Sequence, residues 1–441
     1  MNTNFKQTDI GLIPDDWEVR KVQDAFTFTK KPRILEIDND FVLPFIPMEM
    51  ILENKVYVED FKLKKFGSFS SGTYFENGDI LLAKITPSFE NGKQAIARIP
   101  YKFGYATTEV IPVNEIKDIS SKYFLFNYLL KADVRKRLAG KMEGSTGRQR
   151  LPKTVLQNTS IPLPPLPEQK KIAHVLSQIQ KAIETQEQII KTSQELKKAL
   201  MQKLFTEGLN GEPQKPTEIG LIPESWEVAL IKDYGIVKSN SFSFTKIPTI
   251  DSHKNEDDKV LAIKVSDMNL PGNENILSHS NIEFHVSKSN LIKLKPIPIH
   301  SIIFPKRGAA ISTNKKRMNN HLVILDPNLI AIIPNKDIIP KYLFYWFLTF
   351  DIGRLKDDNP IPQLNKKDVD NVKFPLPKRI EEQNEIINIL DSISMNLYCQ
   401  ISKCSSLRDL FKSNLNLLMT GQIRLKDIEL ELEESLKGIN A

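Results

Sequence analysis

Cysteine, histidine and long apolar runs are scarce in this sequence. Two cysteines, Cys399 and Cys404, and six histidines occur among 441 residues, and neither type forms a ligand spacing for zinc. Cysteines five positions apart on a predicted helix point in different directions, so no structural disulfide is expected. Because no apolar run approaches the length of a membrane span and the first ten residues are polar, we expect a soluble cytoplasmic protein without a membrane partner, metal or cofactor.

Motifs for nucleotide and methyl-group chemistry are also missing. The sequence has neither a Walker-type phosphate loop nor a Gly-x-Gly-x-x-Gly fingerprint. The stretch DNPIPQ, which begins at Asp358, lacks the aromatic residue that would hold a flipped base. PDDWEVRK, from Pro14, has the residue types of a nuclease site, but its carboxylates are too close in sequence and its second copy, PESWEVAL, loses the basic residue. We therefore predict a chain without catalytic activity.

Length and charge are compatible with a multidomain protein that binds a polyanion. A chain of 441 residues is too long for one ordinary core, so more than one domain is expected. Hydrophobic residues make up 40% of the chain, which argues against wholesale disorder. The net charge of +7 and a pI near 9.0 permit binding to nucleic acid but do not require it.

The chain repeats itself. TDIGLIPDDWEVRKVQD begins at Thr8 and TEIGLIPESWEVALIKD at Thr217, with ten identities in seventeen positions. Unrelated segments would share roughly one position in seventeen. Two further pairs follow in the same order: LPKTVLQNTSIPLPPLPEQKKIAHVL from Leu151 with LNKKDVDNVKFPLPKRIEEQNEIINIL from Leu364, and LFTEG from Leu204 with LMTG from Leu418. An internal duplication therefore organises the chain as variable domain, connector, variable domain, connector.

Each variable domain combines strand-like and helix-like segments. The apolar runs GDILLAKIT, from Gly78, and SIIFPKRG, from Ser301, both carry a lysine, and a further strand-like run follows each of them. The aromatic runs KYFLFNYLL, from Lys122, and KYLFYWFL, from Lys341, have helical spacing, which is more typical of a core than of a base-stacking surface. The fold class predicted is α+β, with two α/β domains.

The two connectors are predicted to be long helices. Apolar residues recur at three-and-four spacing from Glu168 to Thr206 and again from Ile386 to Leu418. Stiff proline runs precede both helices, and Gly208 and Gly421 are stop signals. A helix of this length spans about 58 Å. The simplest way to bury both apolar stripes is to pair the helices. We favour an antiparallel coiled coil with approximate two-fold symmetry over a parallel one.

These repeated segments resemble the specificity (S) subunit of type I restriction-modification systems. The resemblance rests on IGLIPDDWEV, on GSTGRQRLPKTVLQNTSIPLPPLPEQKKIAHVL, on LFTEG and on their second copies, and it spans roughly Thr8 to Leu425. The second copy departs from the pattern in FPLPKRIEEQ, where Lys-Arg-Ile replaces Pro-Leu-Pro. In that family the variable segments are target recognition domains, each of which reads half of a bipartite DNA sequence, and the helices set the gap between the halves.

The resemblance implies a domain plan and partners. Residues 1–160 and 211–373 become the first and second target recognition domains, residues 161–210 and 374–425 the connectors, and residues 426–441 an acidic tail. It also implies double-stranded DNA, two methyltransferase (M) subunits and nuclease/translocase (R) subunits as partners, and no catalysis by the S subunit itself. A non-catalytic protein–protein scaffold with incidental basic loops is the alternative reading.

Basic residues near the strand ends are the candidate DNA contacts. Between His300 and Leu325 no acidic residue occurs, and the small polar residues there predict a loop. This basic loop either faces DNA or is simply exposed to solvent. Arg148 and Arg150 lie just before the first connector and could instead pack against it. The full set of candidates is Lys84, Asn91, Lys93, Arg148, Arg150, Lys306, Arg307, Asn314, Lys315, Lys316 and Arg317.

Overall fold

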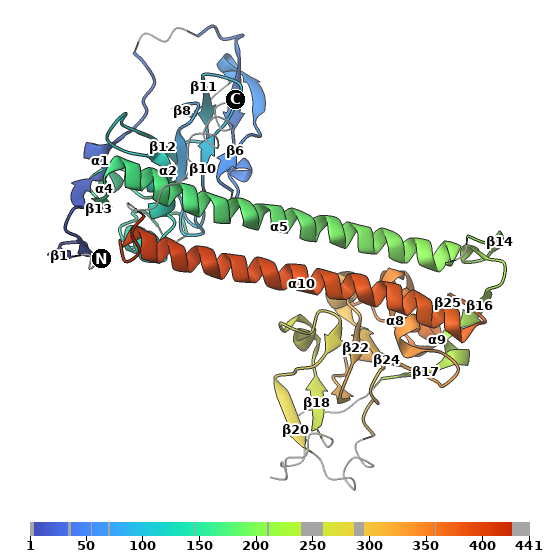
Figure 1. The fold of residues 1–441 in the computed structure, drawn as a ribbon. Helices are drawn as coiled ribbons and strands as arrows, with labels where there is room; N and C mark the ends of the chain where they lie inside the picture. Colours follow the sequence, from blue (N-terminus) through green and yellow to red (C-terminus); the bar gives the residue numbers. More distant parts are fainter. Residues whose placement is uncertain are drawn as a thin grey trace. The chain divides into compact units, whose positions relative to one another are not determined.

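Two units divide the chain. The computed structural model describes residues 4–33, 37–53, 55–68, 71–145, 147–209, 211–239, 259–285, 295–357 and 359–425. Unit 1 comprises Met1–Ile189 with Gln400–Ala441, and unit 2 comprises Ile190–Cys399. Each unit therefore holds one α/β domain together with part of each long helix (Figure 1). The acidic tail expected at 426–441 lies outside the described residues.

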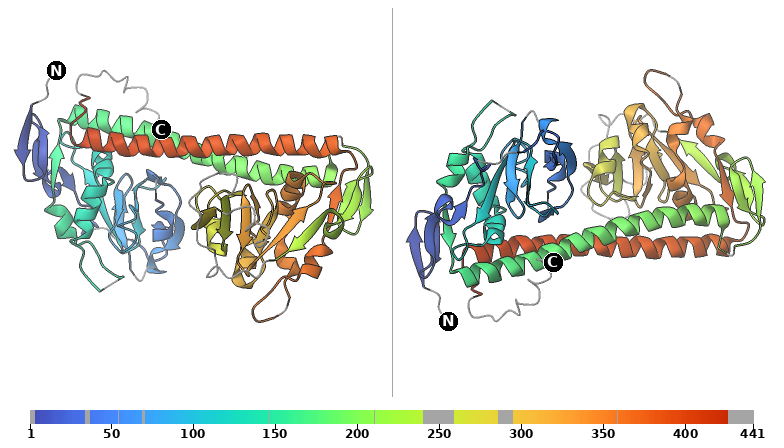
Figure 2. Two further views of the ribbon diagram at one scale, coloured as in Figure 1. Left: turned by 90° about the horizontal axis from the view of Figure 1, so that it is seen from below. Right: turned by 90° about the horizontal axis from the view of Figure 1, so that it is seen from above.

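The two long helices are antiparallel in both units. Helix α5 spans Leu166–Glu207 and helix α10 spans Ile380–Met419, and they run alongside one another in Figure 2. In unit 1, Ile172 near the start of α5 shares a core with Leu418 near the end of α10. In unit 2, Leu204 near the end of α5 shares a core with Ile386 near the start of α10. The predicted antiparallel coiled coil is confirmed.

The first domain contains two main sheets. In each, a pair of neighbouring strands is parallel and the other pairs are antiparallel. Across the five-stranded sheet the order is β4 (Phe26–Thr27), β12 (Val110–Glu115), β9 (Ile80–Ala83), β10 (Gln94–Ala97) and β6 (Tyr57–Val58). Across the four-stranded sheet it is β7 (Lys62–Lys65), β5 (Val42–Ile46), β11 (Phe103–Ala106) and β8 (Thr73–Glu76).

The second domain repeats the strand order of the larger sheet and, among the described residues, three of the four strands of the smaller sheet. Its five-stranded sheet has the order β17 (Gly235–Lys238), β24 (Leu329–Pro334), β21 (Ile302–Pro305), β22 (Arg317–Asn319) and β19 (Ile276–Leu277). Its smaller sheet has the order β20 (Ile282–His285), β18 (Lys259–Ile263) and β23 (Leu322–Leu325). The parallel pair again lies at the edge of the larger sheet, between β19 and β22. The duplication read from the sequence is thus a duplication of strand order.

The aromatic runs belong to the cores, as predicted. Helix α2 spans Lys122–Tyr128 and buries Phe124, Phe126 and Tyr128. Helix α8 spans Pro340–Thr349 and buries its aromatic residues from Tyr342 to Phe347. The other short α-helices among the described residues are α1 (Val22–Ala25), α3 (Ala132–Ala139), α4 (Lys153–Gln157), α6 (Ile231–Tyr234) and α9 (Lys366–Asp370).

Small antiparallel strand pairs complete each copy: β1 (Phe5–Thr8) with β2 (Gly11–Pro14), β3 (Glu18–Lys21) with β13 (Ser160–Leu163), β14 (Gln214–Thr217) with β15 (Gly220–Pro223), and β16 (Glu227–Leu230) with β25 (Lys373–Leu376).

The tryptophan of the doubled IGLIP-x-x-WEV motif connects each domain to the helix pair. Trp17, fully buried, donates its indole N–H to Glu168 in the first turn of α5 at 3.0 Å. Its second-copy counterpart Trp226 donates to Glu382 in the first turn of α10, also at 3.0 Å.

The glycine that ends each helix lies against the tryptophan of the same junction. Gly421 has φ +69°, and a Cβ at this position would come within 2.3 Å of Pro14 and 3.3 Å of the Trp17 ring. Gly208 has φ +67° and meets Trp226 in the same way. Each glycine therefore supplies both the left-handed conformation and the space that its junction needs.

One buried arginine distinguishes the two junctions. Arg424 donates to both carboxylate oxygens of Glu168, at 2.7 and 2.8 Å, and to both of Asp16, at 2.9 and 2.8 Å. Its side chain is 7% exposed and that of Glu168 2%. The second copy has Gly211 three residues after Gly208, where the first has Arg424 three residues after Gly421. Among the residues that the structure describes, only the first junction therefore contains a buried ion pair.

A buried amide pair interrupts the apolar stripe of the helices. Gln186, 2% exposed, donates to the side-chain oxygen of Gln400 at 2.6 Å. Both glutamines lie eighteen positions after the first-turn glutamates Glu168 and Glu382, so the hydrogen bond joins equivalent positions of the two copies. A buried polar pair of this kind favours one register of a coiled coil over its alternatives.

Candidate nucleic-acid interface

The end of strand β9 forms a corner in the first domain. Lys84 follows the strand, donates its backbone N–H to the carbonyl of Glu109 at 2.9 Å and accepts from the N–H of Leu151 at 2.7 Å. Ile85 pairs with Arg150 in an isolated antiparallel bridge. The segment that precedes the first connector thus returns to the end of a central strand. We call Lys84, Ile85, Glu109 and Arg150 the first corner.

The second domain builds an equivalent corner at the end of β21. Lys306 donates to the carbonyl of Asn328 at 2.8 Å and accepts from the N–H of Leu364 at 2.9 Å. Arg307 and Gln363 form the matching antiparallel bridge. We call Lys306, Arg307, Asn328 and Gln363 the second corner. The backbone frame is the same in both corners, although the side chains differ.

Lys84 and Arg150 of the first corner line a cavity of about 490 Å³. The Arg150 guanidinium donates to the two carboxylate oxygens of Glu109 at 2.8 and 2.9 Å. This hydrogen bond lowers the pKa of the Glu109 carboxyl. Lys153 lines the same cavity, and its pKa is lowered by burial and by the charges of Lys30 and Lys84. Three cations, Lys84, Arg150 and Lys153, therefore line this cavity together with Glu143, and Glu109 holds the Arg150 guanidinium.

The second corner also presents an arginine held by a neighbouring side chain. Arg307 donates from Nε to the Gln363 side-chain oxygen at 2.7 Å. Burial, and then the charge of Arg307, lowers the pKa of Lys306. The 3-10 helix η6 (Gly308–Thr313) follows directly and ends at Asn314, which has φ +51° and accepts from the N–H of Ile352 at 3.0 Å.

The basic segment after this corner is more ordered than the sequence indicated. The expected loop contains the 3-10 helix η6 and the strand β22. Lys315 is partly exposed and donates to the side chain of Asn269. Lys316 is 1% exposed, its ammonium donates to the carbonyl of Phe350, and burial lowers its pKa to about 8. Arg317 donates to the carbonyls of Lys316 and Met268. Lys316 is therefore not available to a phosphate, because its charge points into the protein.

Comparison with known proteins decides what these domains are. The family model described as the type I restriction modification DNA specificity domain matches residues 14–193 and again residues 223–401. The chain belongs to this family. It is the DNA-recognition subunit of a type I restriction-modification system and is not a catalytic subunit. The family membership also decides against the reading of the chain as a scaffold with incidental basic loops.

Relatives that are named as specificity subunits support the assignment to this family. The MjaVIII specificity subunit of Methanocaldococcus jannaschii is 26% identical over 459 residues, covering 96% of this chain and 97% of that one. The EcoAI specificity subunit of Escherichia coli is 33% identical over 210 residues, covering 45% of this chain and 36% of that one.

Solved structures share the fold of this specificity subunit. A chain from a study of complex assembly and conformational transition in the type I R-M system matches with a TM-score of 0.57 and 15% identity, over 93% of this chain and 99% of that one. The crystal structure of the S subunit from M. genitalium matches with a TM-score of 0.53 and 18% identity, over 95% of this chain and 99% of that one.

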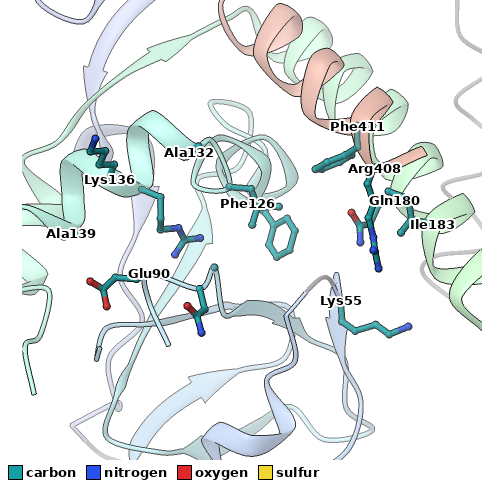
Figure 3. Close-up of a pocket in the computed structure, with 14 residues that line it drawn as sticks. Lys55, Glu90, Phe126, Ala132, Lys136, Ala139, Gln180, Ile183, Arg408 and Phe411 are labelled. Atoms are coloured by element: carbon teal, nitrogen blue, oxygen red, sulfur yellow. The ribbon is translucent and has the colours of Figure 1, made fainter. Parts of the chain in front are cut away.

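Among the candidates in the first domain of this specificity subunit, Lys93, Arg148 and Asn91 do not line the cavity at the first corner. Lys93 accepts at its carbonyl from the N–H of Ala83, and Arg148 is exposed in the turn before Arg150. Asn91 lines a different cavity, of about 800 Å³, between the first domain and the unit 1 part of the helices. Figure 3 shows Phe126 from α2 and Phe411 from α10 on facing sides of it. The structure therefore brings Lys84 and Arg150 together but places Asn91 elsewhere.

The larger cavity contains two arginines that are held by neighbouring groups. Its buried Arg135 donates to the carbonyl of Phe89 and to the side chain of Gln94, and its Arg408 pairs with Glu187.

Within the described ranges, no group of three or more metal-binding side chains is found. Among the helices that the structure describes, none is long and apolar enough to cross a membrane.

Glu109, Lys153 and Gln363 stand beside the candidate cations of the specificity subunit but were not among the predicted DNA contacts. A signal existed for two of them, because Lys153 closes a Leu-x-Lys triplet that recurs in the second copy directly after Gln363. Glu109 gave no such signal, since it pairs with a residue 41 positions away.

Proposed function

We propose that each variable domain reads one half of an asymmetric bipartite DNA target, while helices α5 and α10 set the unspecified spacer. The observation that carries this proposal is the pair of corners, in which one backbone frame presents different side chains in the two domains. Two domains that bind different DNA sequences need a constant backbone frame, which fixes their position on DNA, and variable side chains, which select the bases.

The proposed recognition domains span residues 1–160 and 211–373, with connectors at 161–210 and 374–425. The DNA contacts that the geometry favours are the corner cations and the exposed residue beyond the second corner, namely Lys84, Arg150, Lys153, Lys306, Arg307 and Lys315. Lysines would bind phosphate and arginines would be available to base edges. A subunit that binds the DNA of the cell would act in the cytoplasm.

We further propose two methyltransferase subunits as partners, with nuclease/translocase subunits completing the assembly. The helices expose large apolar side chains that no described contact covers. In unit 2 these are Leu196 at 60%, Met395 at 65% and Tyr398 at 69%, and in unit 1 Ile401 at 47% and Leu410 at 48%. Apolar residues exposed at this density on a helix favour a protein partner.

Tyr398→Glu is expected to weaken binding of the methyltransferase subunit at least tenfold. The aromatic ring would be replaced by a charge that must be desolvated in the interface. Sedimentation or titration calorimetry with the purified partner measures the affinity. Asn396→Glu is the matched control, because it adds the same charge at an exposed position of the same helix. Equal effects of the two variants would remove the docking surface from the proposal.

Selection from random duplexes tests the reading function directly. The chain is mixed with its methyltransferase subunit, and the duplexes that become methylated are sequenced. We expect two short specified blocks separated by a fixed number of unspecified base pairs. Methylation without any sequence preference would contradict the proposal.

A further inference from the structure

We propose that Glu109 determines base specificity: with Arg150 it forms a donor–acceptor unit that reads a G·C pair in the first half of the target. The inference rests on the proposed reading function and deepens it, because it names the side chains and the base pair. Arg307 and Gln363 are the corresponding unit of the second corner. Nothing in the sequence alone pairs these residues.

The first argument is that the two corners exchange side chains on an unchanged frame. The position of Ile85 is taken by Arg307, and the position of Arg150 is taken by Gln363. The arginine has thus moved from the returning segment to the strand end, and the oxygen acceptor has moved from Glu109, before β12, to Gln363 on the returning segment. Both corners nevertheless present one arginine held by one oxygen-bearing side chain. Conserving this unit while rearranging it is expected if the unit reads bases that differ between the two half-sites.

The second argument is that the corner does not need the ion pair for its stability. The Arg150 side chain is 49% exposed and that of Glu109 21%, so solvent screens the pair and its contribution to stability is small. Backbone hydrogen bonds from Lys84, Leu151 and Thr86 close the first corner. The second corner closes with equivalent backbone hydrogen bonds and with an amide in place of a carboxylate. The choice of glutamate at position 109 is therefore left without a structural explanation.

The third argument is geometric and chemical. Arg150 uses Nε and Nη2 for Glu109, and among the described residues its Nη1 has no hydrogen-bond partner. The pair fixes the guanidinium plane while leaving an edge free. In the major groove, guanine offers two acceptors that suit arginine, and the paired cytosine offers a donor that suits a carboxylate. A rigid arginine–glutamate pair matches this pattern on both bases of one G·C pair.

The experiment is the random-duplex selection repeated with Glu109→Gln in the full chain and its methyltransferase subunit. The amide keeps the shape of the side chain but loses the charge and gains a donor, which faces the cytosine amino group unfavourably. We expect discrimination for G·C to fall by about tenfold or more at one position of one half-site, with the other half-site unchanged. The thermal midpoint should remain within the error of the unmodified chain.

Two further variants make the outcome decisive. Glu59→Gln is the matched control, because Glu59 forms an exposed ion pair with Arg98 at 3.0 Å in the same domain. Arg150→Lys keeps the charge but loses the two-pronged hydrogen bonding of the guanidinium, so it should weaken base discrimination at the same position of the half-site. An unchanged preference in Glu109→Gln, or equal loss in both half-sites, would overturn the inference while leaving the reading function intact. Absence of any preference in the unmodified chain would instead overturn the reading function.

Discussion

Replacing Arg424 by methionine is expected to lower the free energy of unfolding by about 3–5 kcal/mol. The arginine is the cation for Glu168, whose side chain is 2% exposed and also accepts from the Trp17 indole. Methionine has a similar volume but no charge, so the Glu168 carboxylate would stay buried without a counter-ion. Urea titration followed by tryptophan fluorescence measures the loss.

Arg408→Met is the control for this variant. Arg408 forms an ion pair of 2.7 Å with Glu187 on the helices, but 57% of its side chain is exposed. An exposed pair of this kind contributes at most about 1 kcal/mol. The double variant Arg424→Met/Glu168→Gln should recover part of the stability, since it removes the orphaned charge. Similar losses for Arg424→Met and Arg408→Met would show that burial of the Glu168 pair does not matter.

This prediction also explains what the doubled motif does. The tryptophan in each copy joins the first turn of one long helix to the glycine that ends the other, so both domains are anchored where the helices meet. The sequence was sufficient to predict two domains and two antiparallel helices. The partner of each indole was not predictable, because Trp17 and Glu168 are 151 positions apart.

The candidate site was harder to predict than the fold, for a physical reason. A hydrophobic repeat reports helix faces directly, since burial and periodicity are linked. A cation has no such link: Lys315 and Lys316 are adjacent and chemically identical, yet one is partly exposed and the other is 1% exposed. The segment was predicted to be a loop, but a strand begins at Arg317. In a strand, successive side chains point to opposite faces, and a loop prediction carries no such information.

The difference between these two lysines leads to the second large expected effect. Lys306→Gln/Lys315→Gln is expected to weaken DNA binding by more than tenfold at low salt. If each lysine neutralises one phosphate, the slope of log K against log salt should flatten by about 1.8. All duplexes should be affected alike, because phosphate contacts carry no sequence information. Fluorescence anisotropy between about 50 and about 200 mM salt measures the slope.

Lys316→Met is the control for this variant, because it removes a neighbouring charge that faces the carbonyl of Phe350 and not solvent. It should change the thermal midpoint and leave the salt slope unaltered. A phosphate contact requires an ammonium that reaches the surface, so the two variants separate the effect of exposed charge from that of total charge. If Lys316→Met flattened the slope as much as Lys306→Gln/Lys315→Gln, net charge and not the second corner would account for the affinity, and the proposed DNA-facing surface would be wrong.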